Sequence, residues 1–128
     1  MFAEPFMRSL SLAVVLLCLP AMASAAALSG TWERSNGHSR LRFDMCGKTT
    51  CGAIAWIKPG VKTSAHIGQQ VFFDLSKAGD AQWQGKAFNP EDGRTYTGNV
   101  SVLGATLVTK GCVLGGLICK SETWKKVD

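Results

Sequence analysis

From Leu28 onward, apolar and polar residues alternate along the chain, and turn sequences interrupt the alternation at short intervals. Within residues 40–45, Leu41, Phe43 and Met45 lie on one side of an extended strand, and charged residues lie on the other. A period of two is typical of a sheet with one buried and one solvated face. The pattern therefore predicts an all-β protein.

The predicted strands are short and consecutive. They cover residues 28–34, 38–45, 52–57, 70–75, 81–88, 94–103, 105–112 and 119–127. Residues 70–75 fit a strand or a single helical turn, and residues 76–80 are expected to interrupt the chain there. Seven or eight short strands with tight turns predict an antiparallel barrel or sandwich, and sequential hairpins favour up-and-down order. We expect a small antiparallel up-and-down barrel.

The turns are predicted from residues that suit turn geometry. Asn36-Gly37 is a strong hairpin signal because both residues accept positive φ. In residues 89–94 (NPEDGR), proline supplies the φ of a turn and glycine a positive φ. A calcium loop is the alternative there, but the spaced carboxylates and closing glutamate of such loops are missing. Residues 58–69 form the longest predicted loop.

The N-terminal residues have the pattern of a cleaved signal peptide. Arg8 precedes an apolar run over residues 10–19, and Ala23-Ser24-Ala25 is a small-residue cleavage signal. We expect a signal peptide at residues 1–25 and one domain at residues 26–128. Residues 25–27 offer a second cleavage site.

Two other interpretations of the N-terminus are less favoured. A membrane anchor needs about 20 apolar residues, about twice the length of this run. A lipoprotein would need a small residue before Cys18, where the chain has Leu17. We expect no transmembrane segment in the mature chain and a periplasmic location.

Four cysteines remain after cleavage, and an even number in an exported chain indicates two disulfides. Three connectivities are open. We favour Cys46–Cys51 and Cys112–Cys119 because each pair brackets a predicted hairpin turn. A four-thiolate zinc site is the alternative, but structural zinc sites prefer closer spacing within each pair. No metal or cofactor is expected.

The charge of the chain excludes one class of partner. Loss of Glu4 and Arg8 with the leader leaves the net charge at +5. The lysines are scattered, as on a surface that keeps a protein soluble, whereas a nucleic-acid interface needs a basic stripe with aromatic residues. We therefore expect no nucleic-acid partner.

Several short motifs together resemble a known family. They are Gly30-Thr31-Trp32, residues 46–56 (CGKTTCGAIAW), residues 89–96 and Thr123-Trp124. In this order they are similar to an uncharacterised family of exported bacterial proteins, domain of unknown function 2147, over nearly all of the mature chain. The resemblance implies a lipocalin-like β-barrel. In lipocalins an arginine of the last strand commonly packs over the first tryptophan, and this chain offers Lys125 and Lys126 there.

The sequence gives little sign of catalysis. His38 follows a hairpin turn and His66 lies in the long loop, and nothing places either beside a nucleophile or a carboxylate. Glu91 and Asp92 are neighbours on a turn and do not suggest an acid–base pair. We expect no catalytic residues and no enzyme.

The four tryptophans are many for about 100 residues, and they either fill a barrel or line a cavity. If a cavity exists, the predicted lining consists of Phe43, Trp56, Trp83, Tyr96 and Leu107. The function predicted is binding of a hydrophobic or amphipathic small molecule. The alternative is an envelope interaction or maintenance protein with a filled barrel, which contacts a protein partner through its surface and the 58–69 loop.

Overall fold

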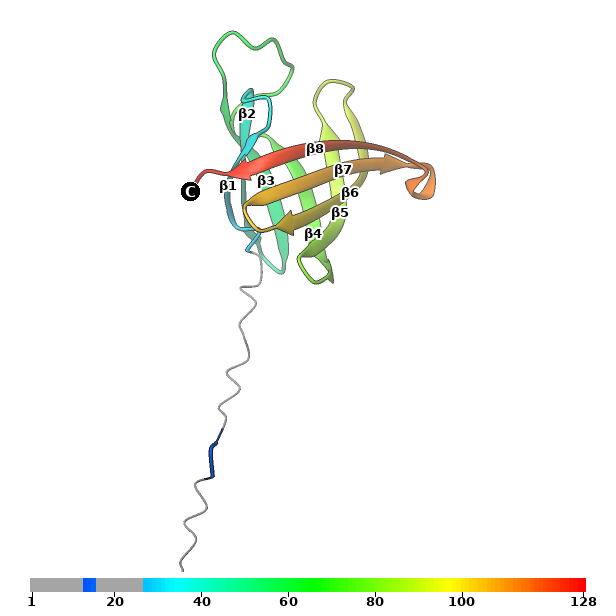
Figure 1. The fold of residues 1–128 in the computed structure, drawn as a ribbon. Coiled ribbons are helices and arrows are strands. Elements are labelled where there is room, and N and C mark those ends of the chain that lie inside the picture. The colour runs from blue at the N-terminus through cyan, green and yellow to red at the C-terminus, as the bar shows by residue number, and fades with distance from the viewer. Residues whose placement is uncertain (1–12, 16–26) are drawn as a thin grey trace, which may run out of the picture.

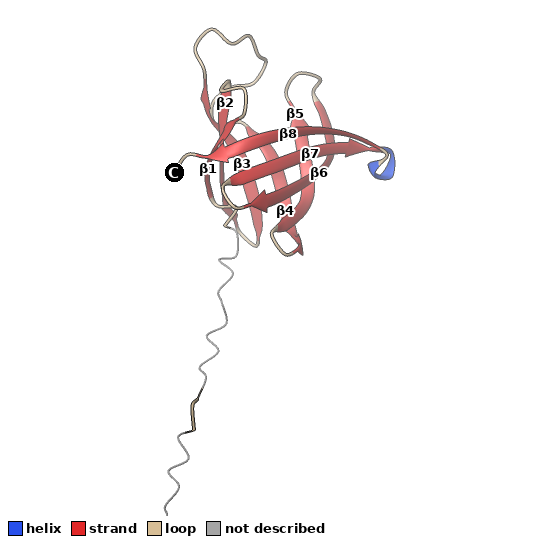
Figure 2. Ribbon diagram, viewed as in Figure 1, coloured by secondary structure: helices blue, strands red, loops and turns tan. Residues whose placement is uncertain are grey.

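The computed structural model describes residues 13–15 and 27–128, and the predicted signal peptide at residues 1–25 lies outside this part except for residues 13–15. Eight strands follow one another along the chain (Figures 1 and 2). They are β1 (Gly30–Arg34), β2 (Ser39–Cys46), β3 (Thr49–Ile57), β4 (Gln70–Gly79), β5 (Gln82–Asn89), β6 (Arg94–Leu103), β7 (Thr106–Val113) and β8 (Ile118–Lys126).

Each strand pairs antiparallel with the next, and β8 pairs with β1 to close the barrel. The predicted all-β, up-and-down barrel is therefore confirmed. Within the described residues, the single helical element is η1 (Leu114–Gly116), a 3₁₀ turn between β7 and β8 (Figure 2). No helix in this part of the chain is long and apolar enough to cross a bilayer.

The predicted interruption at residues 76–80 is wrong, because β4 continues to Gly79. Phe72 and Leu75 are both buried although they are three residues apart, which a regular strand does not allow. The pairing of β4 with β5 shifts between Phe73 and Ser76, and Asp74 there has φ 55°. Such a bulge resets the alternation, and this is why the sequence pattern hid the second half of the strand.

The two ends of the barrel differ in their connections. One end, called the open end below, carries residues 35–38, the β3–β4 loop (58–69), the β5–β6 turn (90–93) and the β7–β8 turn (114–117). In Figure 1 the β3–β4 loop is at the top and η1 is at the right. The other end, called the closed end, carries three two-residue turns and the start of β1.

Large side chains fill the barrel towards the closed end. Trp32, Phe43 and Leu107 are 0 % exposed. The indole N–H of Trp32 donates to the Leu28 carbonyl at 3.0 Å, so burial leaves no unpaired donor. The Phe43 ring lies against Gly52, its partner on β3, where a Cβ would be 2.6 Å from the ring.

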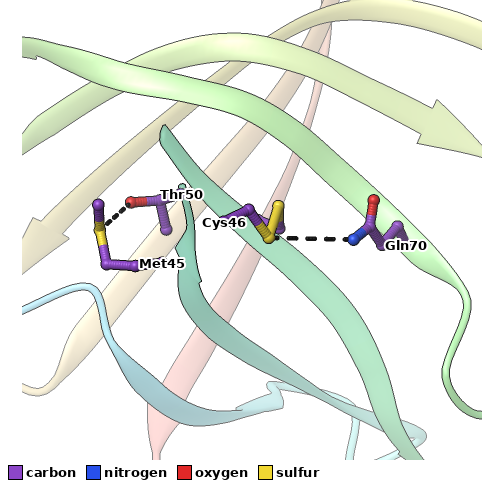
Figure 3. Close-up of a disulfide and its surroundings, with 5 residues drawn as sticks. Met45, Cys46, Thr50 and Gln70 are labelled. Atoms are coloured by element: carbon purple, nitrogen blue, oxygen red, sulfur yellow. Dashed lines mark hydrogen bonds between the residues drawn. A yellow bond between two sulfur atoms is a disulfide. The ribbon is translucent and has the colours of Figure 1, made fainter. Parts of the chain in front are cut away.

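Both favoured disulfides form. Cys46–Cys51 joins β2 to β3 (Figure 3), and Cys112–Cys119 joins β7 to β8 at the base of the η1 turn. All four sulfurs are paired, so no thiolate is left for the alternative zinc site. Two disulfides in so small a domain are typical of a protein exported to an oxidising compartment.

Candidate functional site

A cavity of about 600 Å³ lies inside the barrel and opens at the open end. Its volume is within the range of small-molecule sites in proteins. Buried apolar side chains form its inner wall: Leu41, Ile54, Val71, Phe72, Ala87 and Trp124. Charged and polar side chains form its rim: Arg34, His38, Lys62, Glu91, Asp92, Lys120 and Glu122.

Small inward-facing residues create this space. Ala87, Thr109 and Gly111 line the cavity, whereas the layer towards the closed end holds Trp32 and Phe43. Strand alternation points all of these side chains into the same barrel. The interior is therefore filled at one end and hollow at the other because of side-chain volume.

Trp124 contributes an aromatic ring with a polar N–H group to the inner wall. Its indole N–H donates to the Thr109 hydroxyl at 2.9 Å. Both residues are buried and both line the cavity. Because the indole N–H is already bonded, the ring presents apolar surface to an occupant.

An ion pair spans β1 and β8 at the rim. The Arg34 guanidinium donates from Nε to Glu122 Oε2 at 3.1 Å and makes a second, shorter contact with Glu122 Oε1. The two side chains are 33 % and 31 % exposed. A bidentate pair holds both groups in one geometry, so the rim is ordered at this point.

Glu91 attaches the β3–β4 loop to the β5–β6 turn across the mouth. Its Oε1 accepts from the Thr63 hydroxyl at 2.5 Å and from the Ser64 N–H at 3.1 Å. The Thr63 hydroxyl, and then the Ser64 N–H, hold the pKa of Glu91 below its ordinary value. The carboxylate form of Glu91 therefore fastens the longest loop, and this contact is called the loop latch below.

Asp92 is bonded in the same turn. The Tyr96 hydroxyl donates to Asp92 Oδ2, and the Arg94 N–H donates to Oδ1 at 2.9 Å. These bonds, the Tyr96 hydroxyl first, lower the pKa of Asp92, and Asp92 in turn raises the pKa of Tyr96. Asn89 Oδ1 likewise accepts from the Glu91 N–H at 2.9 Å. Side chains bonded to their own backbone fit the predicted turn.

The rim carries charges of both signs. Glu91, Asp92 and Glu122 each accept hydrogen bonds from neighbouring residues. Among the described residues, Lys62 and Lys120 make no ion pair. Among the same residues, Glu91 and Asp92 make no ion pair either, because the hydroxyl and amide groups that donate to them are neutral. An occupant of the mouth therefore meets free charges of both signs.

The five residues predicted to line a cavity lie in different places. Tyr96 lines the cavity. Phe43 and Leu107 are fully buried and do not border it. Trp83 is half-buried against the core and borders a separate, polar hollow with Asn99 and Lys110.

Trp56 lies on the outer face of the barrel. It pairs with Arg40 across β2 and β3, and the Arg40 guanidinium stacks 4.8 Å from its ring centroid. A register shift between Arg40 and Leu41 places Trp56 on the side opposite Ile54. Without the bulge, the alternation of β3 would have put both residues on the inner face.

The sequence interpretation missed the rim residues Arg34, Lys120 and Glu122. The sequence contained a signal for two of them. Arg34 is two residues from Trp32, and Glu122 is two residues from Trp124, so on a strand each lies on the same face as that tryptophan. Charged residues at inward positions near a strand end indicate a polar mouth. Of the two histidines, His38 lies on the rim and His66 lies in the exposed loop.

The first tryptophan has a basic side chain over its ring. Lys126 Nζ of the last strand lies 5.4 Å from the Trp32 ring centroid. Of the two lysines that the sequence offered for this place, Lys126 takes it. The contact covers the closed end of the barrel.

Comparisons with known proteins agree with this architecture. The family described as "Uncharacterized protein conserved in bacteria (DUF2147)" matches residues 30–126. A solved structure described as "Protein HP1028 from the human pathogen Helicobacter pylori belongs to the lipocalin family" is similar, with a TM-score of 0.66 and 20 % sequence identity. The likeness covers 80 % of this chain and 84 % of that one. No curated protein sequence matches the chain. The fold is lipocalin-like.

Proposed function

We propose that this protein is an exported binding protein for a hydrophobic or amphipathic small molecule. It belongs to the DUF2147 family of uncharacterized bacterial proteins. The observation that carries this proposal is the cavity of about 600 Å³ inside the barrel. A cavity with an apolar wall and a few polar groups at one side is the usual form of a small-molecule site.

The arrangement of the wall and the rim favours an amphipathic ligand. An apolar tail would lie against Leu41, Phe72 and Trp124, and a head group would remain at the mouth. The rim carries both lysines and carboxylates without an ion pair, so it can meet the charge of a head group of either sign.

The proposal assigns the protein to the periplasm and gives it no catalytic role. Two disulfides and the leader-like N-terminus support export to an oxidising compartment. Glu91 and Asp92 are exposed and have lowered pKa values, so they are ionised at neutral pH. A general acid needs a raised pKa instead.

A second candidate is an envelope protein that contacts a protein partner through the β3–β4 loop. The loop latch favours it, because a loop already fastened in one conformation loses less entropy on binding. Co-purification of a stoichiometric protein partner, lost on replacing residues 60–68, would support this candidate over the first.

Tryptophan fluorescence tests the binding function. A panel of fatty acids and an apolar dye is titrated into the protein, and saturable quenching is expected because Trp124 borders the cavity. In Trp124→Phe most of the change should disappear while dye binding persists. Trp56→Phe is the control, because Trp56 lies on the outer face. An unchanged signal across the panel contradicts the proposal, as does quenching that depends on Trp56.

A further inference from the structure

The β7–β8 turn carries an exposed apolar surface beside the mouth of the cavity. Residues 113–118 (VLGGLI) are called the hairpin tip here. The exposed large apolar side chains of the tip are Val113 (37 %), Leu114 (69 %), Leu117 (85 %) and Ile118 (59 %). Four of the ten exposed large apolar residues of the described chain therefore lie within six positions. Such clustering on a surface marks an interaction site.

The shape of the tip is convex and fixed. Figure 1 shows the β7–β8 hairpin extending beyond the rest of the barrel at the right. The Cys112–Cys119 disulfide closes its base, and the Leu117 N–H donates to the Leu114 carbonyl at 3.3 Å. Because the turn projects and a disulfide closes its base, its leucines are exposed to solvent, and the turn needs no further ordering when it binds.

The backbone conformation at Leu114 suggests that its side chain has a role outside the folded chain. Leu114 has φ 54°, a conformation that asparagine or glycine adopts more easily than leucine. The side chain is 69 % exposed, so burial in the folded protein does not compensate for this conformation. Backbone strain at an exposed apolar residue points to contact with something outside the chain.

We propose that the hairpin tip docks on the surface of a bilayer that contains anionic phospholipid. Lys110 and Lys120 flank the tip, and residues 110–121 contain no acidic residue. Apolar side chains enter the interface while lysines meet anionic head groups. A protein partner fits less well, because binding energy at protein interfaces concentrates in Trp, Tyr and Arg, which the tip lacks.

Docking would orient the cavity. Val113 and Ile118 belong to the tip and also line the mouth of the cavity. A bilayer at the tip therefore lies beside the mouth, and an amphipathic ligand can pass between the two. This last step rests on the proposed function, whereas docking itself does not.

Vesicle co-sedimentation tests the docking. The probes are vesicles of phosphatidylcholine alone and of equal parts phosphatidylcholine and phosphatidylglycerol. Wild-type protein should bind the anionic vesicles more strongly and lose binding as salt rises. The variant Leu114→Asn/Leu117→Ser should bind at least about tenfold more weakly, because it lacks the two leucines that docking would bury in the bilayer interface.

Two controls make the outcome specific. Leu103→Ser removes a leucine that is 71 % exposed at the closed end and should leave vesicle binding unchanged. Leu114→Asn alone should not lower the urea midpoint, since asparagine accepts the backbone conformation. Neither Leu114 nor Leu117 borders the cavity, so dye affinity in solution should also be unchanged. If the wild-type protein binds no dye, the proposed function is contradicted, but the docking proposal is not affected.

Three results would overturn the docking proposal. They are no binding to either vesicle, an equal loss in Leu103→Ser, and a wild-type dimer that the tip variant converts to monomer without any vesicle binding. The last result would assign the tip to contact between two copies of this chain.

Discussion

The two ends of this barrel are built from the same eight strands, yet one is a packed core and the other is a cavity. Towards the closed end, Trp32, Phe43 and Leu107 have no exposed surface. Towards the open end, Ala87, Thr109 and Gly111 occupy the corresponding inward positions around a space of about 600 Å³. The difference shows that strand pairing sets the diameter, and side-chain volume decides how much of the interior is filled.

Polar groups follow the same division. At the closed end they cover the core from outside: Lys126 lies over Trp32, and Asp128 accepts from the Thr31 N–H at 2.7 Å. At the open end they surround a hollow and include the Arg34–Glu122 pair. Changes at the closed end should therefore alter stability, and changes at the open end should alter binding.

The largest effect is expected for Trp32→Ala. Removing a fully buried tryptophan should lower the free energy of unfolding by about 3–5 kcal/mol. Urea denaturation followed by circular dichroism measures it. Trp56→Ala on the outer face is the matched control and should cost no more than about 1 kcal/mol. Equal costs for the two variants would contradict the division between core and outer face.

Gly111→Leu should fill the cavity with little effect on stability. A Cβ at this position would be 3.6 Å from Tyr96 Cβ, an ordinary contact, and the rest of the side chain can enter the space. Dye affinity should fall about tenfold or more, roughly 1.4 kcal/mol of binding, with a urea midpoint close to wild type. Gly52→Leu is the contrasting variant, since its Cβ would collide with the Phe43 ring, so it should destabilise the protein. Unchanged dye affinity in Gly111→Leu would place the ligand elsewhere.

Glu122→Gln should separate the effect of the Arg34–Glu122 ion pair on stability from its effect on ligand binding. Because both partners are partly exposed, its loss should cost about 1 kcal/mol or less of stability. It also leaves the Arg34 guanidinium without its carboxylate at the mouth, so affinity for a fatty acid should rise relative to a neutral alcohol of equal length. Glu33→Gln removes a similar pair with Arg40 on the outer face and should not change this ratio. A rise in both variants would point to net charge alone.

The sequence predicted the parts of the fold that depend on neighbouring residues. Strand alternation, the turn at Asn36-Gly37 and the two disulfides all follow from short spacings, and the structure has each of them. The bulges in β3 and β4 depend on pairing with other strands, so Trp56 and residues 76–79 were placed incorrectly. Cavity lining depends on where eight strands meet, and Tyr96 alone of the five predicted residues borders the cavity.

The smallest effect concerns the loop latch and its pH dependence. Glu91 has a lowered pKa in the folded protein. The latch is therefore complete above the ordinary value of 4.5 and is lost as pH falls through the lowered value. The Ser64 amide should exchange with solvent faster, relative to its intrinsic rate, only below pH 4.5, while amides at the closed end stay protected. Glu91→Ala should expose the Ser64 amide at neutral pH, and Thr63→Val should do so in part because it removes the hydroxyl donor. A midpoint above 4.5, or full protection in Glu91→Ala, would mean that the β3–β4 loop is held by other contacts.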